Sequence, residues 1–277
     1  MRIGSALFLM SIGLLTAQDK QQARQAASDE ALRLGVEAYK SAKYAQAVKF
    51  FQKVVDLNPQ ALEARLYLGI ACVAQYVPGS ESPQNVELAN RAEAQFERVL
   101  AVDDRNETAI AWLASFKYMQ AQSTAEGPKK DAALDEAAKW YQKQVEVNPD
   151  DPEAHYTLGV IAWNKWYPHG LEARARSGMR PEDPGPLRDD RIRRQLDTQY
   201  RGLIEDGIAH LRIAVAMNPQ HDDAMTYLNL LLRGHADLAA TQESFNADVK
   251  EADEWGMRAL EAKKRKAIST PQVVPRP

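Results

Sequence analysis

Cysteine is almost absent from this sequence: Cys72 is the only one among 277 residues. A single thiol forms neither an intramolecular disulfide nor a multi-cysteine metal site. An excess of basic charge is lacking too, since 35 Lys and Arg stand against 38 Asp and Glu, for a formal net charge of −3. A protein that binds nucleic acid through a basic field would carry the opposite balance. We therefore expect no nucleic-acid partner, and a fold that is stabilised by its core alone.

Catalytic and metal-binding motifs are missing as well. The five histidines never stand at a metal-ligand spacing such as H-x-x-x-H, and the sequence has no G-x-S-x-G, phosphate-binding glycine loop or zinc signature. Cys72 falls on the inner face of an expected helix, where a small buried thiol is a better interpretation than a nucleophile. We predict that the protein is not an enzyme and that it has no catalytic residue, bound metal or small-molecule cofactor.

The N-terminus carries an uncharged apolar run, residues 3–15, that follows Met1 and Arg2 and precedes Ala17. About 20 apolar residues are needed to span a bilayer, so this run is short for a membrane helix. Its positive start and the small residue after it are typical of a secretory signal peptide. We predict a signal peptide over residues 1–18, export to the periplasm or cell envelope, and membrane contact only through this segment if it stays uncleaved. An uncleaved anchor and an N-terminal extension that packs on the fold are the alternatives.

Alanine, by contrast, is abundant, with 43 residues against 14 Gly and 14 Pro. Alanine loses no side-chain entropy in a helix and lets helices approach closely. Because 45% of the residues are hydrophobic and 26% are charged, the composition is that of a soluble globular chain rather than a membrane bundle or a disordered one. The composition therefore predicts a mostly helical protein.

Four segments of the chain end in the same way. Each has an apolar helix end closed by Asn-Pro or, once, by Asp-Asp, and a leucine stands nine residues after each end. The ends lie at residues 59, 104, 149 and 219, and the leucines are Leu68, Leu113, Leu158 and Leu228. The first copy carries, in order, Leu34, Gly35, Ala47, Phe51 and Pro59. Such internal self-similarity indicates stacked helical repeats.

This pattern of an early Leu-Gly, a later Ala-x-x-x-Phe and a final Pro resembles the tetratricopeptide repeat, whose period is about 34 residues. The resemblance implies an all-α fold, a right-handed solenoid of helix-turn-helix pairs in which the early glycine of helix A lets helix B approach closely. We expect a tetratricopeptide-like array over residues 28–267, with repeats over about 28–61, 62–106, 107–151 and 152–221 and a degenerate pair over 222–267. Residues 268–277 are expected to be a disordered tail.

The repeat ends are farther apart than the family period, at 45, 45 and 70 residues. The excess lies between helix A and helix B, and it predicts lengthened B helices that begin near Pro83 and Pro128, and a long one over about 188–217. We place every proline outside the helices or at their start, because proline lacks the N–H that a helix interior uses. Residues 168–187 are therefore expected to form a polar loop. A helix near 225–235 and a capping helix near 242–266 are expected to close the stack.

The resemblance also implies a binding surface. In the family, fixed positions of helix A line the inner face of the superhelix, and the matching positions here give an apolar and aromatic partner groove. The groove residues are Leu32, Val36, Tyr39, Leu66, Ile70, Tyr118, Tyr156 and Trp163. Such a surface suits an extended peptide or an amphipathic helix anchored by Tyr and Trp. The alternative is that long B helices, the insertions or the last helix cover this face and make these residues part of the core.

The segment from Trp163 to Arg194 departs most from the family pattern and is rich in aromatic residues and arginine. It is either a recognition loop for an acidic partner or a structural segment whose arginines are offset by neighbouring acids. Our leading hypothesis is a non-enzymatic scaffold or adaptor that binds a protein or peptide in the cell envelope. A structural subunit of an envelope assembly and an enzyme with a site near Trp163–Arg194 are the alternatives.

Overall fold

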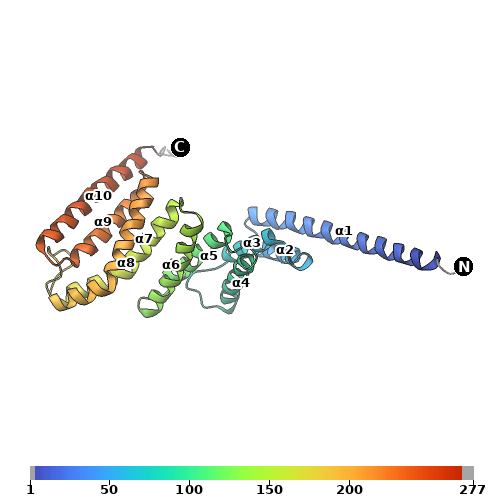
Figure 1. Cartoon of the computed structure of the whole chain (residues 1–277), viewed down its shortest axis with the longest axis horizontal. Helices are drawn as coiled ribbons and strands as arrows, with labels where there is room; N and C mark the ends of the chain where they lie inside the picture. Colours follow the sequence, from blue (N-terminus) through green and yellow to red (C-terminus); the bar gives the residue numbers. More distant parts are fainter. Residues whose placement is uncertain (1–3, 270–277) are drawn as a thin grey trace, which may run out of the picture. The chain divides into compact units, whose positions relative to one another are not determined.

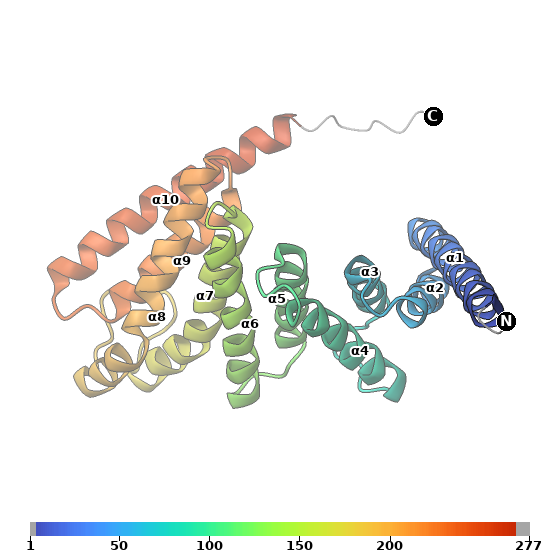
Figure 2. The ribbon, with the colours of Figure 1, turned by 45° about the vertical axis from the view of Figure 1, so that its right-hand side comes forward.

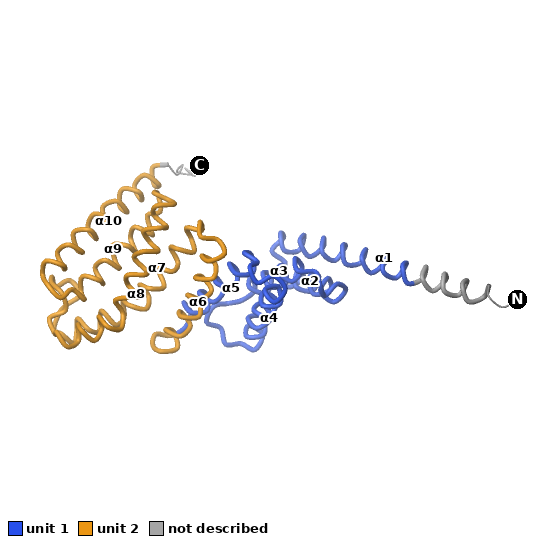
Figure 3. Tube along the Cα trace, in the orientation of Figure 1, with its two compact units in different colours: residues 1–124 blue, residues 125–277 orange. Residues whose placement is uncertain are grey.

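The computed structural model describes the backbone of residues 4–269 and the side chains of residues 17–268. Within this part of the chain it has ten α-helices and no β-strand, which confirms the predicted fold class. The chain divides into two compact units, residues 1–124 and residues 125–277 (Figure 3). The division falls inside the third predicted repeat, so each unit is described by itself.

The predictions at the two chain ends fall largely on residues that the structure does not describe. Most of the predicted tail, residues 270–277, lies outside the described residues, as do residues 1–3 and the side chains of residues 1–16 in the predicted signal peptide. A search of the described helices finds none with the length and apolar character that crossing a membrane requires.

Unit 1 contains five helices that follow the predicted order. They are α1 (Gly4–Lys40), α2 (Tyr44–Leu57), α3 (Leu62–Val73), α4 (Pro83–Leu100) and α5 (Glu107–Gln122). Each helix packs on the next one along the chain (Figure 1). Because α1 is continuous, it joins the helix of the first predicted repeat to the segment before it, and the side chains of residues 17–26 are exposed along it.

Glycine sets the contact between the paired helices of unit 1, as the repeat pattern predicts. A Cβ atom on Gly35 would lie 2.6 Å from Phe51 Cε1, and one on Gly69 would lie 2.7 Å from Phe96 Cε1. No real side chain tolerates such distances, so only glycine lets the two rings pack against the neighbouring helix. Both phenylalanines are fully buried. The Leu-Gly and Phe positions of the sequence pattern are therefore the two halves of one contact.

Unit 2 is built from longer helices. They are α6 (Pro128–Val147), α7 (Pro152–Arg176), α8 (Asp190–Met217), α9 (Asp222–Asp237) and α10 (Gln242–Ser269). Helix α7 contacts α6, α8 and α9, and α10 packs along α9, so these helices run beside one another (Figure 2). The predicted starts at Pro83 and Pro128 are confirmed, and α8 begins two residues after its predicted start. The inner face of α10 buries Ala252, Ala259 and Ala262 and closes the core of this unit as the predicted cap.

The prediction for Pro168 is wrong. We expected every proline outside a helix or at its start, and a loop from residue 168 to residue 187, yet α7 continues through Pro168 to Arg176. An interior proline removes one helical hydrogen bond and costs about 3 kcal/mol. Packing offsets this cost, because Trp166, Gly170 and Ala173 are buried on either side of the proline. The loop between α7 and α8 is therefore only residues 177–189.

Candidate functional site

The predicted groove residues are distributed over both units. Helices α1 and α3 of unit 1 carry five of them, α5 carries Tyr118, and α7 of unit 2 carries Tyr156 and Trp163. Ile70 is buried, with 8% of its surface exposed, and it contributes to the core of unit 1. The other seven are half-buried, which is the burial expected at the surface of a helix pair.

Two of the tyrosines in unit 1 have partners within the chain. The Tyr39 ring centre lies 5.3 Å from that of Tyr44, and burial raises the pKa of the Tyr39 hydroxyl above its usual range. The Tyr118 hydroxyl accepts a hydrogen bond from Gln122 Nε2 at 2.5 Å. These contacts hold the rings in place at the surface of the unit. They leave open whether a partner binds over them.

The two groove residues of unit 2 belong to separate aromatic clusters. Tyr156 packs between His221 and Tyr227, with ring centres 4.6 and 5.9 Å away. Trp163 lies one turn before Tyr167, with ring centres 4.9 Å apart. Trp163 also lines a pocket to which Tyr156 does not contribute.

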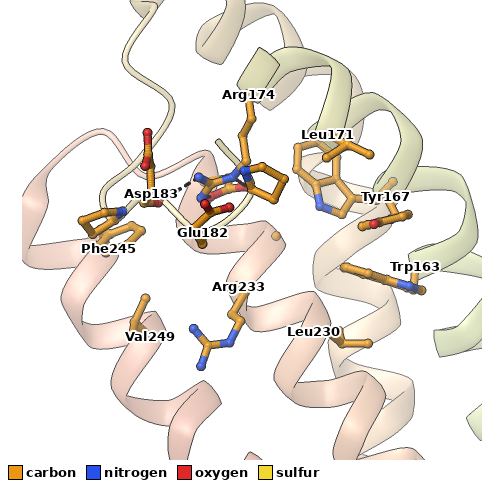
Figure 4. A pocket seen from close by; sticks show the side chains of 16 residues that line it. Trp163, Tyr167, Leu171, Arg174, Glu182, Asp183, Leu230, Arg233, Phe245 and Val249 are labelled. Atoms are coloured by element: carbon orange, nitrogen blue, oxygen red, sulfur yellow. Dashed lines mark hydrogen bonds and ion pairs between the residues drawn. The ribbon is translucent and has the colours of Figure 1, made fainter. Parts of the chain in front are cut away.

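This pocket lies between α7, α9, α10 and the 177–189 loop, and we call it the α7–α10 pocket (Figure 4). Its volume is about 380 Å³. Eleven of its sixteen lining residues are uncharged, and the five charged ones are Arg174, Glu182, Asp183, Arg233 and Asp237. The residues labelled in the figure are Trp163, Tyr167, Leu171, Arg174, Glu182, Asp183, Leu230, Arg233, Phe245 and Val249.

One wall of the pocket is a single stripe of α7. Trp163, Tyr167 and Leu171 are four residues apart, so they share one face of the helix. Tyr167 and Leu171 are 48% and 37% exposed, which is unusual for large apolar side chains beside a cavity. The opposite wall comes from Phe245 and Val249 of α10 (Figure 4). The pocket therefore presents apolar surface to solvent between two rigid helices.

The base of the pocket depends on close packing around Trp166, which is 2% exposed. A Cβ atom on Gly234 of α9 would lie 2.3 Å from Trp166 Nε1, and one on Gly170 would lie 2.8 Å from its Cζ2. Both glycines are thus required for the indole to fit between α7 and α9. The ring also meets Tyr200 of α8 edge to face, with centres 5.7 Å apart. This packing fixes the spacing of the pocket walls.

A buried ion pair lies at the end of the pocket next to the 177–189 loop. Arg174 of α7 donates from Nε to Asp237 Oδ2 at 3.0 Å and forms a second bond from Nη2 to Oδ1. Its Nη1 donates to the Asp183 carbonyl at 3.0 Å, so the guanidinium is held on three sides. Burial raises the pKa of the Asp237 carboxyl, and the Arg174 pair opposes that rise. The Leu187 N–H donates to the Asp237 carbonyl at 3.0 Å, which ties the loop to the end of α9.

The other charged side chains around the pocket are also paired. Asp183 bonds both the backbone and the side chain of Arg180, which together hold the pKa of its carboxyl below the usual range. Arg233 pairs with Asp253, and Arg188 reaches Asp183 at 3.6 Å. Asp189 caps α8 by accepting the N–H groups of Arg191 and Ile192. This arrangement favours the structural interpretation of the arginine-rich segment, in which neighbouring acids offset its charge.

Sequence reasoning identified Trp163 of this pocket and missed its other apolar walls. The regular spacing of Trp163, Tyr167 and Leu171 was visible in the sequence. The prediction that the helix ends at Pro168 places Leu171 in a loop, so the spacing did not indicate a shared helix face. Phe245 and Val249 are 74 or more residues away from Leu171 along the chain, and no local pattern brings them to it.

Metal-ligating side chains do not gather anywhere in residues 17–268. Within them there is no cluster of three or more His, Cys, Asp or Glu side chains able to hold a metal ion. Cys72 is buried, as predicted, and burial raises the pKa of its thiol to about 11. The thiolate is scarce at neutral pH, so this cysteine is a poor nucleophile.

Comparison with known proteins identifies a family model and solved structures that are similar to this chain. Residues 32–75 match the family model described as tetratricopeptide repeat. The crystal structure of MamA protein is similar to the chain with a TM-score of 0.54 and 16% identity, over 90% of this chain and 98% of that one. MamA 41-end from Desulfovibrio magneticus RS-1 gives 0.54 and 14%, over 86% and 96%. The MamA RS-1 ArsTM double mutant gives 0.56 and 14%, over 88% and 98%.

No curated protein sequence matches the chain significantly. At identities of 14–16%, the likeness to these structures concerns the fold. The first of them is covered almost completely, so the shared arrangement extends over nearly all of that chain. Residues 32–75 therefore match a tetratricopeptide repeat, and the chain has the helical-repeat fold of the MamA structures.

Proposed function

We propose that the protein is a non-enzymatic interaction scaffold that binds a peptide or protein segment, and that the α7–α10 pocket anchors an apolar side chain of this partner. The observation that carries the proposal is the stripe of half-buried Trp163 and exposed Tyr167 and Leu171 beside a pocket of about 380 Å³. Buried aromatic anchors in preformed pockets supply most of the affinity at many protein interfaces. The tetratricopeptide match supports the scaffold role, since stacked helical repeats create extended binding surfaces.

The charges around the pocket indicate what kind of side chain it accepts. Arg174, Asp237 and Asp183 are already held by ion pairs or hydrogen bonds within the chain. A charged ligand would have to compete with these pairs and pay for its own desolvation. An aromatic or aliphatic side chain needs only the apolar walls. The partner is therefore a segment with an exposed Phe, Trp, Tyr, Leu or Met.

The test uses a random peptide library displayed on phage and selected against the full chain. Binders are synthesised and their affinities measured by calorimetry on the wild type and on Tyr167→Ala and Leu171→Ala. Truncating an anchor wall at a hot spot costs 2 kcal/mol or more, so we expect roughly 30-fold weaker binding. Tyr118→Ala in unit 1 is the matched control, because it removes a half-buried tyrosine of the predicted groove outside the pocket.

Comparing Tyr167→Ala with Tyr118→Ala distinguishes the possible sites. Loss of binding with Tyr167→Ala alone supports the pocket in unit 2. Loss with Tyr118→Ala alone supports the predicted groove in unit 1 and contradicts the pocket as the anchor. Binders that both variants retain, or a library that yields no binder, contradict both sites.

We also propose that the protein is exported to the periplasm or cell envelope. The apolar run of residues 3–15, which follows a positively charged start, supports this proposal. N-terminal sequencing of the protein isolated from its own cells tests this. A start just after Ala17 supports a cleaved signal peptide. A start at Met1, in protein recovered from the cytoplasm, contradicts export.

A further inference from the structure

The outer face of α10 carries large apolar side chains that none of the described residues of unit 2 covers. Met257 and Leu260 are 61% and 54% exposed, one turn apart, while Ala252, Ala259 and Ala262 on the opposite face are buried in the core. A last helix whose function is only to cap a repeat array would carry polar residues on its outer face. The outer face of α10 therefore has a feature that capping does not explain.

These side chains belong to a regular stripe, which we call the α10 stripe. It consists of Lys250, Asp253, Met257, Leu260 and Lys264, and all five are exposed. The steps between them alternate between three and four residues, which keeps them on one narrow face of the helix. This spacing is the one at which two helices pack side by side as a coiled coil.

We propose that the α10 stripe binds the same stripe of a second copy of this chain, with the two helices antiparallel. A two-fold axis midway between residues 258 and 259 places Met257 of one copy on Leu260 of the other. The same axis places Asp253 opposite Lys264, twice per dimer. The stripe is thus complementary to itself in both shape and charge, as a two-fold symmetric interface requires.

The charge order excludes the parallel arrangement. Two parallel helices in register would bring Asp253 onto Asp253 and Lys264 onto Lys264, which is repulsive. The Asp253 carboxylate already contacts Arg233 within the chain, but its side chain is 58% exposed and has room for a second cation. The partner's lysine at position 264 would therefore join an existing pair rather than create an isolated one.

A single pair of helices forms a small interface, below about 1,200 Å² in total. We therefore expect a monomer–dimer equilibrium that depends on protein concentration rather than a permanent dimer. Sedimentation equilibrium of the full chain across a concentration series is the measurement. The wild type should move from the monomer mass toward twice that mass as the concentration rises.

Charge-reversed variants test the proposed register. Asp253→Lys and Lys264→Asp each place like charges opposite each other in the dimer, so each alone should lose self-association. An equimolar mixture of the two variants should regain it, because every cross-pair is then attractive. Met257→Ser should also lose it, whereas Glu254→Lys, which changes the same charge one position off the stripe, should associate like the wild type.

Three results would overturn the proposal. The first is a wild type that stays monomeric at all concentrations. The second is a dimer that persists in Met257→Ser, which would mean association through another face. The third is a mixture of the two charge variants that stays monomeric although both are folded by circular dichroism, because the antiparallel register would then be wrong.

Discussion

Unit 1 and unit 2 bring their helices together by the same glycine contact but then differ in what else connects them. In unit 1, Gly35 and Gly69 each receive a phenylalanine of the next helix. In unit 2, Gly159 receives Leu211 in the same way, and a Cβ atom there would lie 2.3 Å from Leu211 Cγ. Both units also have polar connections between helices, such as Arg91–Gln52 and Lys117–Glu93 in unit 1. Those of unit 2 include a nearly buried Arg–Asp pair and contacts between histidines, and they have no counterpart among the repeat positions of the sequence pattern.

Three such connections join the helices of unit 2. Arg174 and Asp237 join α7 to α9. His155 of α7 and His210 of α8 share a short contact, with their Nδ1 atoms 2.7 Å apart. Arg201 of α8 contacts His235 of α9 at 2.8 Å, and His235 in turn contacts Asp248 of α10 at 2.8 Å. The His155–His210 contact lies beside the Gly159–Leu211 contact, whereas the Arg174–Asp237 and Arg201–His235–Asp248 contacts join the helices farther along their length.

The largest expected effect compares the central aromatic of each unit. Trp166→Ala and Phe96→Ala each empty a fully packed position, and each should lower the free energy of unfolding by about 3–5 kcal/mol. Hydrogen exchange measured by mass spectrometry reports the two units separately. We expect Trp166→Ala to lose protection in α6–α10 and Phe96→Ala to lose it in α1–α5. Loss of protection throughout the chain in both variants would contradict the division into two units.

The next effect concerns the Arg174–Asp237 ion pair of unit 2, whose side chains are 13% and 11% exposed. Asp237→Ala leaves the Arg174 guanidinium without its carboxylate in a site where both side chains are nearly buried, which should cost about 3 kcal/mol. The double variant Arg174→Met, Asp237→Leu removes both charges and should recover most of that loss in urea denaturation. If the double variant is as unstable as Asp237→Ala, the pair contributes through shape rather than charge.

These two predictions also mark what the sequence alone determines. The glycine, alanine and phenylalanine positions recur at fixed offsets, and because each contact joins neighbouring helices of one repeat, the sequence predicted the starts of α4, α6 and α8 to within two residues. The contacts of unit 2 instead join residues such as Arg174 and Asp237, 63 positions apart, which no repeat spacing relates.

The candidate site shows the same limit. Trp163 lies at a family position and was predicted, but the pocket beside it depends on α7 continuing through Pro168. Local rules end a helix there, because proline removes a hydrogen bond. The packing of Trp166 against Gly234 of α9 outweighs that loss, and it is visible only once the helices are placed. The sequence thus predicted where the site begins and not the surface that completes it.

A third prediction uses pH, because all five histidines lie in unit 2. Burial lowers the pKa of the His210 imidazole, the nearby His155 lowers it further, and Asp206 opposes the shift. His155 Nε2 lies 3.0 Å from the Pro149 carbonyl and donates to it, so its Nδ1 is free to accept the His210 proton. If both imidazoles were protonated, each Nδ1 would carry a hydrogen, and the Nδ1–Nδ1 hydrogen bond between His155 and His210 would be lost.

The direction of the effect follows from proton binding. The unfolded chain binds a proton at His210 at a higher pH than the folded chain does, so unit 2 should lose stability as the pH falls below about 6.5. Hydrogen exchange at pH 7.5 and 5.5, corrected for intrinsic rates, should show the loss in α7 and α8 and not in unit 1. His210→Gln should reduce this pH dependence, and an unchanged dependence in that variant would assign it to another group.

The smallest expected effect compares one helix start in each unit. Ser82 caps α4 through a single bond from the Asn85 N–H at 3.3 Å, whereas Asp151 caps α7 through the N–H groups of Glu153 and Ala154 at 3.0 and 3.1 Å. Asp151 also accepts a bond from Gln144 at 2.6 Å, which connects α6 to α7. Loss of an N-cap costs about 0.5–2 kcal/mol, so Ser82→Ala should fall near the lower end and Asp151→Ala near the upper end. Urea denaturation of the two variants measures the difference.

Asp151→Asn separates the two contributions of the carboxylate, because the amide oxygen still caps the helix while the charge is lost. The stability of this variant should lie between that of the wild type and that of Asp151→Ala. Equal losses for Ser82→Ala and Asp151→Ala would mean that the additional polar contact of unit 2 adds no stability at this position.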